Sequence, residues 1–185
     1  MTDPLLKYRE QHKHRLNYMP WLYWSLKPKH REWAEQWQAE YQAYLMEMET
    51  VEIGKNCFIS PLAHIFAERG RKISIGDNTF IAADCTLHGP LQIGNEVAIN
   101  HHCILDGGRA GIKLHDQVRI AAYSHLYAFD HGMDLERPIY QQAVTSKGIE
   151  IGQDVWLGAH VGIKDGVKIG DHAVIGMNSM VTKDI

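Results

Sequence analysis

Residues 148–185 read GIEIGQDVWLGAHVGIKDGVKIGDHAVIGMNSMVTKDI, and an aliphatic residue recurs in this stretch at every sixth position. These aliphatic positions are Ile151, Leu157, Ile163, Ile169, Ile175 and Val181. A second set of small or apolar residues runs two positions ahead, and residues two apart in a strand share a face. One short strand and one tight turn per six residues therefore predict stacked strands with both residue sets pointing inward.

The same spacing runs back along the chain to residue 53, with short slips and one long gap. Its earlier aliphatic positions are Ile53, Ile59, Ile65, Ile75, Ile81, Leu87, Ile93, Ile99, Leu105, Leu114, Ile120 and Leu126. Three strands per turn give 18-residue coils, so about six coils are predicted, stacked as an all-β parallel solenoid. Cys57, Cys85 and Cys103 fall in the inward set, and we expect buried free thiols.

Residues 1–50 lack the repeat and are predicted to form an N-terminal helical segment before a solenoid domain at 51–185. Pro20 and Pro28 divide this segment into short pieces. From His30 to Glu49 we expect a helix that packs on the solenoid or on a neighbouring subunit; a wall of a substrate site is the alternative. Its apolar stripe at helical spacing comprises Trp33, Trp37, Tyr41, Tyr44 and Met48.

Composition excludes several classes of function. The net charge is −3, and no basic run points to nucleic acid. The chain has no apolar run of about 18 residues and no signal-peptide pattern. We therefore expect a cytoplasmic protein with neither a nucleic-acid nor a membrane partner.

Four short motifs in a fixed order carry a resemblance to a known family. They are Asp154-Val155-Trp156, Asp165-Gly166-Val167, Val174-Ile175-Gly176 and Val181-Thr182-Lys183-Asp184. With the repeat over residues 51–185, this set resembles the hexapeptide-repeat acyltransferases, especially the galactoside and maltose O-acetyltransferase branch. The resemblance implies a left-handed β-helix, a homotrimer, acetyl-CoA as acyl donor, no metal, and transfer to a hydroxyl of a sugar or related small molecule.

The long gap in the repeat predicts an external loop at about residues 127–148, which contains AFDHGMDLERPI (128–139). A filled prism has no interior for substrate, so a reactive group must lie on such an excursion. In the family branch, a loop histidine deprotonates the acceptor hydroxyl, and the matching residue is His131. An imidazole titrates near neutral pH and suits this role. His125 is the alternative base, and the carboxylate that orients the ring stays open among Asp130, Asp134 and Glu136.

The remaining histidines of the repeat fall on turn or outward positions, where we expect ordinary surface residues. They are His64, His88, His101, His102, His115, His160 and His172.

The resemblance also assigns binding residues. Asn100 and Asp106 match the acceptor-binding asparagine and aspartate of the family. The groove for the pantetheine arm of acetyl-CoA matches Trp156, Ala159, Met177, Ser179, Thr182 and Lys183.

Two other functions remain open at this point. A zinc enzyme similar to γ-carbonic anhydrases would recruit His102, His125 and His131, because three imidazoles and a water form a catalytic zinc site. A non-catalytic trimeric scaffold is the other alternative. The identity of the acceptor, and transfer to nitrogen rather than oxygen, are also open.

Overall fold

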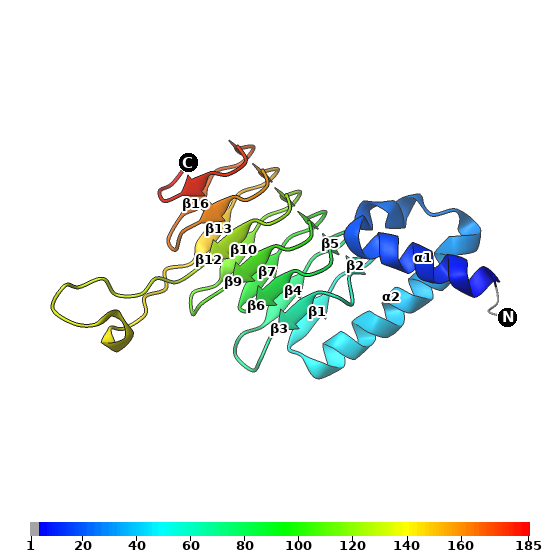
Figure 1. Ribbon diagram of the computed structural model, residues 1–185, viewed down its shortest axis with the longest axis horizontal. Helices are drawn as coiled ribbons and strands as arrows, with labels where there is room; N and C mark the ends of the chain where they lie inside the picture. Colours follow the sequence, from blue (N-terminus) through cyan, green and yellow to red (C-terminus); the bar gives the residue numbers. More distant parts are fainter. Residues whose placement is uncertain (1–3) are drawn as a thin grey trace.

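The computed structural model describes residues 4–185, in which helices precede a stack of short strands (Figure 1). The helices are α1 (Pro4–Tyr18), the 3-10 helix η1 (Pro20–Ser25) and α2 (Pro28–Met48). Pro20 and Pro28 each open their helix, where a fixed φ and a missing N–H suit the first turn. No helix within residues 4–185 has the length and apolar character needed to cross a membrane.

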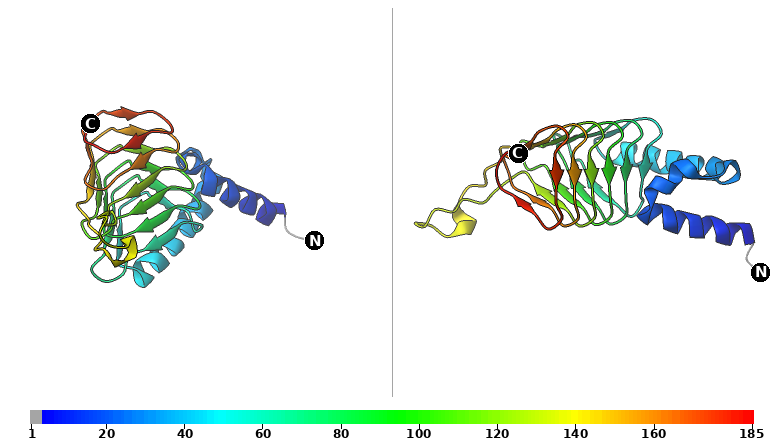
Figure 2. Two further views of the ribbon diagram at one scale, coloured as in Figure 1. Left: turned by 60° about the vertical axis from the view of Figure 1, so that its left-hand side comes forward. Right: turned by 90° about the horizontal axis from the view of Figure 1, so that it is seen from above.

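Strands β1 to β18 form three parallel six-stranded sheets, one on each face of a prism (Figures 1 and 2). Sheet A contains β1 (Val51–Ile53), β4 (Ile73–Ile75), β7 (Leu91–Ile93), β10 (Ile112–Leu114), β13 (Ile149–Ile151) and β16 (Lys168–Ile169). Sheet B contains β2 (Phe58–Ile59), β5 (Phe80–Ile81), β8 (Ala98–Ile99), β11 (Arg119–Ile120), β14 (Trp156–Leu157) and β17 (Val174–Ile175). Sheet C contains β3 (His64–Phe66), β6 (Thr86–His88), β9 (Ile104–Asp106), β12 (His125–Tyr127), β15 (Gly162–Ile163) and β18 (Met180–Val181). Each coil gives one strand to each sheet, so the predicted six-coil parallel solenoid is confirmed.

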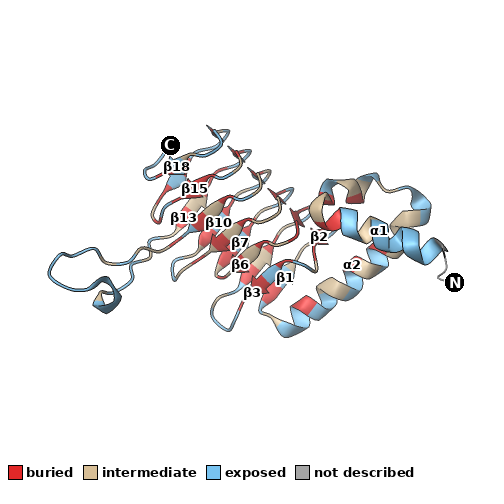
Figure 3. Ribbon diagram, in the orientation of Figure 1, coloured by how far each residue is buried: buried red, intermediate tan, exposed pale blue. Residues whose placement is uncertain are grey.

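Both residue sets of the repeat are almost entirely buried, as predicted, and Figure 3 shows buried residues along the strands of the prism. In the aliphatic set only Ile53 is partly exposed, and in the second set only Ala173 and Ser179 of the last coil are. The three cysteines are buried and free. A hydrogen bond with Cys103, together with burial, raises the pKa of Cys85, so this thiol stays protonated at neutral pH.

The corner between sheets A and B is closed by a ladder of side-chain acceptors. Asp77 Oδ1 accepts the backbone N–H of Lys55 at 2.7 Å, and Asn95 Oδ1 accepts that of Asp77 at 2.8 Å. Asp116 Oδ1 continues the ladder by accepting the N–H of Asn95 at 2.7 Å. The coils meet so closely here that a Cβ on Gly76 would lie 2.6 Å from a backbone oxygen of the next coil. A side chain at that position would push the coils apart.

Helix α2 covers the open N-terminal end of the prism. Gln38 is buried, and its amide both donates to the carbonyl of Ile59 at 3.1 Å and accepts the N–H of Ile59 at 2.7 Å. Gln42 Nε2 donates to the carbonyl of Cys57 at 2.9 Å. These amides pair the exposed edge of β2, which a solenoid must protect at its first coil.

The helices also cover part of the outer face of sheet B. Tyr23 and Trp37 lie against Phe58, with ring centroids 5.4 and 5.9 Å apart, and Trp24 lies 6.1 Å from Phe80. Packing of this segment on the solenoid therefore agrees with the prediction.

The predicted apolar stripe of this helix is wrong in part. Tyr44 and Met48 are exposed, whereas the face toward the solenoid carries Ala34, Gln38, Tyr41 and Leu45. Gln38 lies on this face because its amide pairs the free backbone N–H and carbonyl of Ile59 at the edge of β2.

Candidate functional site

The long gap in the repeat is an excursion that leaves the prism after β12 and returns at β13 (Figures 1 and 2). Its two arms are joined by Asp130 and Thr145, and the N–H of each donates to the carbonyl of the other at 2.9 Å. Lys164 Nζ lies 3.0 Å from Asp130 Oδ2 and ties the outgoing arm to the next coil. The stem of the loop is therefore fixed to the prism.

The returning arm is fastened by two polar side chains. Ser146 Oγ donates to the carbonyl of Ala128 at 2.5 Å and accepts two N–H groups of the preceding coil at 3.0 Å. The buried carboxylate of Asp165 accepts the N–H groups of Lys147 and Gly148 at 2.9 Å. These contacts define where the chain re-enters the solenoid.

The tip of the loop has its own hydrogen-bond network, which includes the short 3-10 helix η2 (Ile139–Gln141). Gln142 Oε1 accepts the N–H of Asp134 at 2.8 Å, and Gln142 Nε2 donates to the carbonyls of Asp134 and Arg137 at 2.8 Å. Although the tip is internally bonded, its apolar side chains face solvent, notably Met133 (75% exposed), Leu135 and Tyr140 (82% exposed).

His131 lies in this loop and is exposed. Its ring meets that of Phe129 edge to face, with centroids 6.4 Å apart. Within residues 4–185 it forms no hydrogen bond with Asp130, Asp134 or Glu136, the three carboxylates considered for orienting it. The imidazole is therefore exposed without being oriented by any of these three carboxylates.

His125, the alternative base, projects from the outer face of β12. Its Nε2 lies over Gly162, where an added Cβ would be 2.7 Å away, and Met180 crowds the same glycine. The absence of a side chain at Gly162 makes room for His125 to lie against sheet C, away from the tip of the loop.

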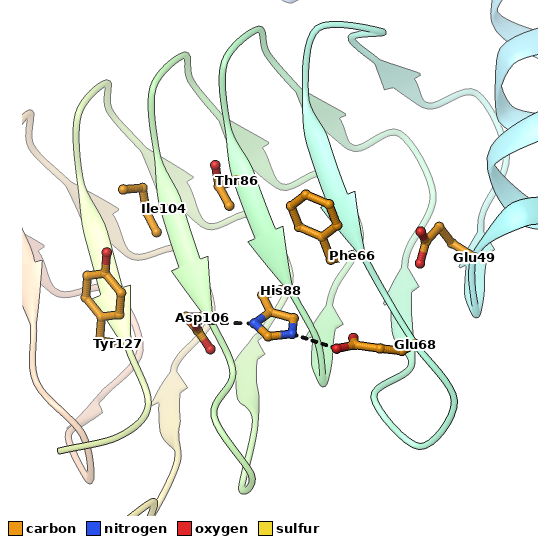
Figure 4. A pocket seen from close by; sticks show the side chains of 8 residues that line it. All are labelled: Glu49, Phe66, Glu68, Thr86, His88, Ile104, Asp106 and Tyr127. Atoms are coloured by element: carbon orange, nitrogen blue, oxygen red, sulfur yellow. Dashed lines mark hydrogen bonds and ion pairs between the residues drawn. The ribbon is translucent and has the colours of Figure 1, made fainter. Parts of the chain in front are cut away.

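A groove of about 520 Å3 runs along the outer face of sheet C (Figure 4). Strand register places its central residues side by side: Phe66 neighbours His88, His88 neighbours Asp106, and Asp106 neighbours Tyr127. Its remaining lining residues are Glu49, Glu68, Thr86 and Ile104. Glu49 directly follows α2, so a residue next to the helical segment lines this groove.

His88 lies at the centre of the groove, between two carboxylates (Figure 4). Its Nε2 is 3.1 Å from Glu68 Oε1, and its Nδ1 is 3.4 Å from Asp106 Oδ2. The backbone N–H of Glu68 itself, followed by His88, lowers the pKa of the Glu68 carboxyl. Arg71 Nη2 donates to the carbonyl of Gly108 at 2.8 Å, and the same nitrogen lies 3.8 Å from Asp106 Oδ1.

The sequence predicts an ordinary surface histidine at position 88, whereas the structure places His88 in a groove between two carboxylates. The signal was present, because residues 88 and 106 are separated by one coil of 18 residues and both face outward. Outward residues one coil apart are neighbours in a parallel sheet.

A second cavity, of about 460 Å3, opens on the other side of His88 and Asp106 toward the stem of the loop. Its further lining residues are Arg71, Gly108, Arg109, Phe129, Ala143, Val144 and Ser146. The arginines and the loop stem make this side of the site more basic than the groove.

The two predicted acceptor residues are not brought together. Asp106 lines both cavities, whereas Asn100 lies past the end of β8, where its Nδ2 donates to the carbonyl of Ile120 at 2.9 Å. The amide of Asn100 therefore binds the backbone of the next coil.

The residues predicted to bind the coenzyme all lie on the last two coils, but they are spread over different faces and corners of the prism. Trp156 is exposed on sheet B, and the backbone N–H of Asn178 donates to Ala159 at 2.9 Å at the following corner. Met177 and Ser179 flank Asn178, and Thr182 and Lys183 follow β18. The six are Trp156, Ala159, Met177, Ser179, Thr182 and Lys183.

Within residues 4–185, no group of three or more His, Cys, Asp or Glu side chains is arranged to hold a metal ion. His102, one of the three histidines of the zinc alternative, stacks on Tyr123 with ring centroids 4.8 Å apart.

Comparison with known proteins shows which proteins the chain resembles. Residues 148–183 match the family described as bacterial transferase hexapeptide (six repeats). Galactoside O-acetyltransferases from Escherichia coli and Lactococcus lactis are 29% and 31% identical, each over 80% of this chain. This chain covers 62% and 61% of those two proteins, or about three fifths of their length.

Solved structures give the same result. One similar structure is that of a variant of AntD, an N-acyltransferase from Bacillus cereus, in complex with dTDP and coenzyme A. It aligns with TM-score 0.68 and 29% identity, over 78% of this chain and 79% of that one. A galactoside acetyltransferase in complex with coenzyme A aligns with TM-score 0.53 and 25% identity over 100% of this chain and 76% of that one. The chain is similar in sequence and fold to hexapeptide-repeat acyltransferases, and its relatives include galactoside O-acetyltransferases, in agreement with the resemblance carried by the sequence motifs.

Proposed function

We propose that this protein transfers an acetyl group from acetyl-CoA to a hydroxyl of a sugar or related small molecule, with His131 as general base. His131 takes the proton of the acceptor hydroxyl while the oxygen attacks the thioester carbonyl carbon. The carbon–sulfur bond then breaks, and the proton on His131 passes to the leaving sulfur. Nothing remains on the protein, and no nucleophilic side chain is needed.

The observation that carries this proposal is the position of His131 on a firmly anchored loop outside a filled prism. The loop has the rigidity that a catalytic group requires, because Asp130, Ser146 and Asp165 hold its stem. Among the described residues, 4–185, none forms a hydrogen bond with the exposed imidazole, whose ring contact is with Phe129. Its orienting carboxylate stays open among Asp130, Asp134 and Glu136.

We propose a homotrimer as the active form. The exposed apolar residues of the loop tip, among them Met133, Leu135 and Tyr140, favour a position against a second subunit, since such side chains are costly to leave in water. In this arrangement the loop of one subunit would meet the coils of another, and the site would be completed between subunits. Mass photometry at micromolar and nanomolar concentration tests the stoichiometry.

We assign the donor site to the last two coils, through Trp156, Ala159, Met177, Ser179, Thr182 and Lys183, and keep Asn100 and Asp106 as acceptor residues. Exposed Lys183 would meet a coenzyme phosphate as a point charge. The coenzyme A complexes of related acyltransferases support acetyl-CoA or another acyl-CoA as the donor.

Transfer to nitrogen is the second candidate function. AntD is named an N-acyltransferase, and a dTDP-4-amino-4,6-dideoxy-D-glucose acyltransferase from Escherichia coli is 30% identical over 60% of this chain. An unprotonated amine can use the same base and donor.

The test is release of coenzyme A thiol from acetyl-CoA in the presence of simple sugars, nucleotide sugars and amino sugars, with product masses measured. The proposal expects an added acetyl group that mild base removes, because esters are labile and amides are not. A base-stable product would establish N-transfer instead, and no release with any acceptor would overturn the proposed function.

A further inference from the structure

We infer that a basic cavity between the N-terminal helices binds the phosphate group of a small organic molecule. The cavity has a volume of about 370 Å3 and is lined by residues of α1, η1 and the beginning of α2. These helices stand at one end of the prism, whereas the C-terminal coils and the loop of His131 lie away from them (Figures 1 and 2). The inference therefore goes beyond the proposed function and adds a second, separate binding site.

The lining of the cavity is strongly basic. Its basic residues are His12, Arg15, Lys27, Lys29 and His30. Among the described residues that line it, none is acidic. Residues 4–31, which run from α1 to the beginning of α2, contain seven Lys and Arg side chains and one acidic residue, although the whole chain has a net charge of −3. A concave surface lined by charges of one sign attracts a ligand of the opposite sign.

Three of these cations have no counter-charge on the chain. Within residues 4–185, Arg15, Lys27 and Lys29 form no ion pair, whereas Lys13 on the same helix as Arg15 pairs with Glu10 at 3.0 Å. Arginine and lysine side chains are positively charged at neutral pH. Three such charges around one cavity repel each other, and a bound anion would turn that repulsion into attraction.

The beginning of α2 adds to the preference for an anion. Its first turn has no acidic side chain, and Lys27 at the N-cap makes no side-chain capping hydrogen bond. The N-terminal end of a helix carries a partial positive charge, so cations at this end are unfavourable unless an anion lies among them. Desolvation, followed by positive neighbours of which His12 is the first, lowers the pKa of His30. The direction of this shift agrees with a site that has cations on the chain and no carboxylate beside them.

A phosphate group matches these charges better than a carboxylate does. A phosphate monoester carries about −1.5 to −2 charge at neutral pH and has three strong acceptor oxygens. The planar guanidinium of Arg15 can donate two parallel hydrogen bonds to such a group, and Lys27 and Lys29 would add point charges. A carboxylate has one negative charge and would leave most of the positive charge without compensation.

The apolar part of the lining indicates that the phosphate belongs to an organic molecule. Leu16, Leu22 and Leu26 line the cavity, and the rings of His12 and His30 lie against each other with centroids 4.5 Å apart. The volume of about 370 Å3 is in the range of small-molecule pockets and exceeds what one phosphate group fills. The site therefore fits an organic phosphate whose carbon part is apolar or flat.

The test is binding of phenyl phosphate to the full chain without any acyl donor, measured by ligand-observed NMR titration at low ionic strength. Phenyl sulfate and benzoate are the comparison probes, because each carries a single negative charge on the same ring. Inorganic phosphate reports the contribution of the phosphate group alone. The probes differ in charge and in carbon content, so they separate the two parts of the inference.

The variants are Arg15→Gln and the double variant Lys27→Gln, Lys29→Gln. All three side chains are exposed, so their replacement leaves no buried group unpaired, and circular dichroism checks the fold. Lys7→Gln is the matched control, because Lys7 is an exposed cation of the same helix outside the cavity.

We expect phenyl phosphate to bind at least about fivefold more tightly than phenyl sulfate or benzoate, and more tightly than inorganic phosphate. Arg15→Gln and the double lysine variant should each weaken its binding by about tenfold. Lys7→Gln should bind it within about twofold of the unmodified protein, because an exposed charge outside the cavity is screened.

Three results would overturn the inference. Unchanged binding in Arg15→Gln and in the double lysine variant would place the phosphate elsewhere on the chain, such as at the proposed donor site. Equal losses in Lys7→Gln and Arg15→Gln would indicate attraction to the general positive charge of the helices. Equal binding of phenyl phosphate, phenyl sulfate and benzoate, or no binding at about 10 mM, would remove the preference for an organic phosphate.

Discussion

Replacing Asp165 with alanine should loosen the return of the loop that carries His131 more than any comparable change at another corner. The carboxylate is 7% exposed and accepts two backbone N–H groups, of Lys147 and Gly148, at 2.9 Å. A hydrogen bond to a charged group contributes roughly 1.5–3 kcal/mol, and water can replace part of it because Lys147 is exposed. We therefore expect Asp165→Ala to lower the free energy of unfolding by about 2–3 kcal/mol.

The matched control is Asp171→Ala. Asp171 Oδ1 accepts one N–H, that of Gln153, at 2.7 Å on an exposed corner away from the loop. One exposed hydrogen bond contributes about 0.5–1 kcal/mol, so this variant should lose much less stability. The backbone amides of residues 144–149 should also keep their native protection from hydrogen exchange in this variant.

Two measurements check the reasoning. Urea unfolding followed by tryptophan fluorescence gives the stability of both variants, and hydrogen exchange gives the local opening of residues 144–149. A local loss of about 2 kcal/mol corresponds to roughly thirtyfold faster exchange at Lys147 and Gly148. Equal stability losses in the two variants, or unchanged exchange at these amides in Asp165→Ala, would refute the anchoring role.

Three further predictions concern the fold. Gln38→Ala leaves the backbone N–H and carbonyl of Ile59 unpaired, so the free energy of unfolding measured in urea should fall by about 2–3 kcal/mol. Gln36→Ala on the exposed face is the control and should change that free energy by less than about 0.5 kcal/mol. Burial, followed by the charge of Glu35, raises the pKa of Tyr23 from 10.0 to about 12. The stability this contributes is complete below pH 10 and is lost as pH rises through 12, so the thermal midpoint should fall over that window, and less in Tyr23→Phe. A thiol reagent should label none of the buried cysteines in the native protein and all three in denaturant, and native labelling would contradict the packing of Cys57, Cys85 and Cys103.

The sequence predicts most of the solenoid because its rule is simple. An inward residue at every sixth position is a direct consequence of strand alternation and of the length of a coil. The structure departs from this rule only in the first and last coils, at residues such as Ile53 and Ala173. The same rule indicates which residues face outward. It does not rank them, which is why His88 was placed with the surface histidines.

Other features depend on contacts that no periodicity describes. Gln38 is buried because the edge of β2 needs a polar partner, and an apolar stripe cannot reveal such a partner. Glu68 reaches His88 from an irregular corner that lies outside the repeat. The loop of His131 was located by the gap in the repeat, whereas the side chains that anchor it became visible only in three dimensions.

The proposed role of His131 is tested most directly by the turnover of acetyl-CoA in His131→Ala, once an acceptor is known from the sugar panel. His172→Ala is the control, because His172 is an exposed histidine on a corner far along the chain from the loop. With His131 as general base, kcat should fall by about 10²–10⁴-fold while circular dichroism and thermal midpoint stay unchanged, and His172→Ala should keep full turnover. A His131→Ala protein that turns over as fast as the unmodified enzyme would contradict the account.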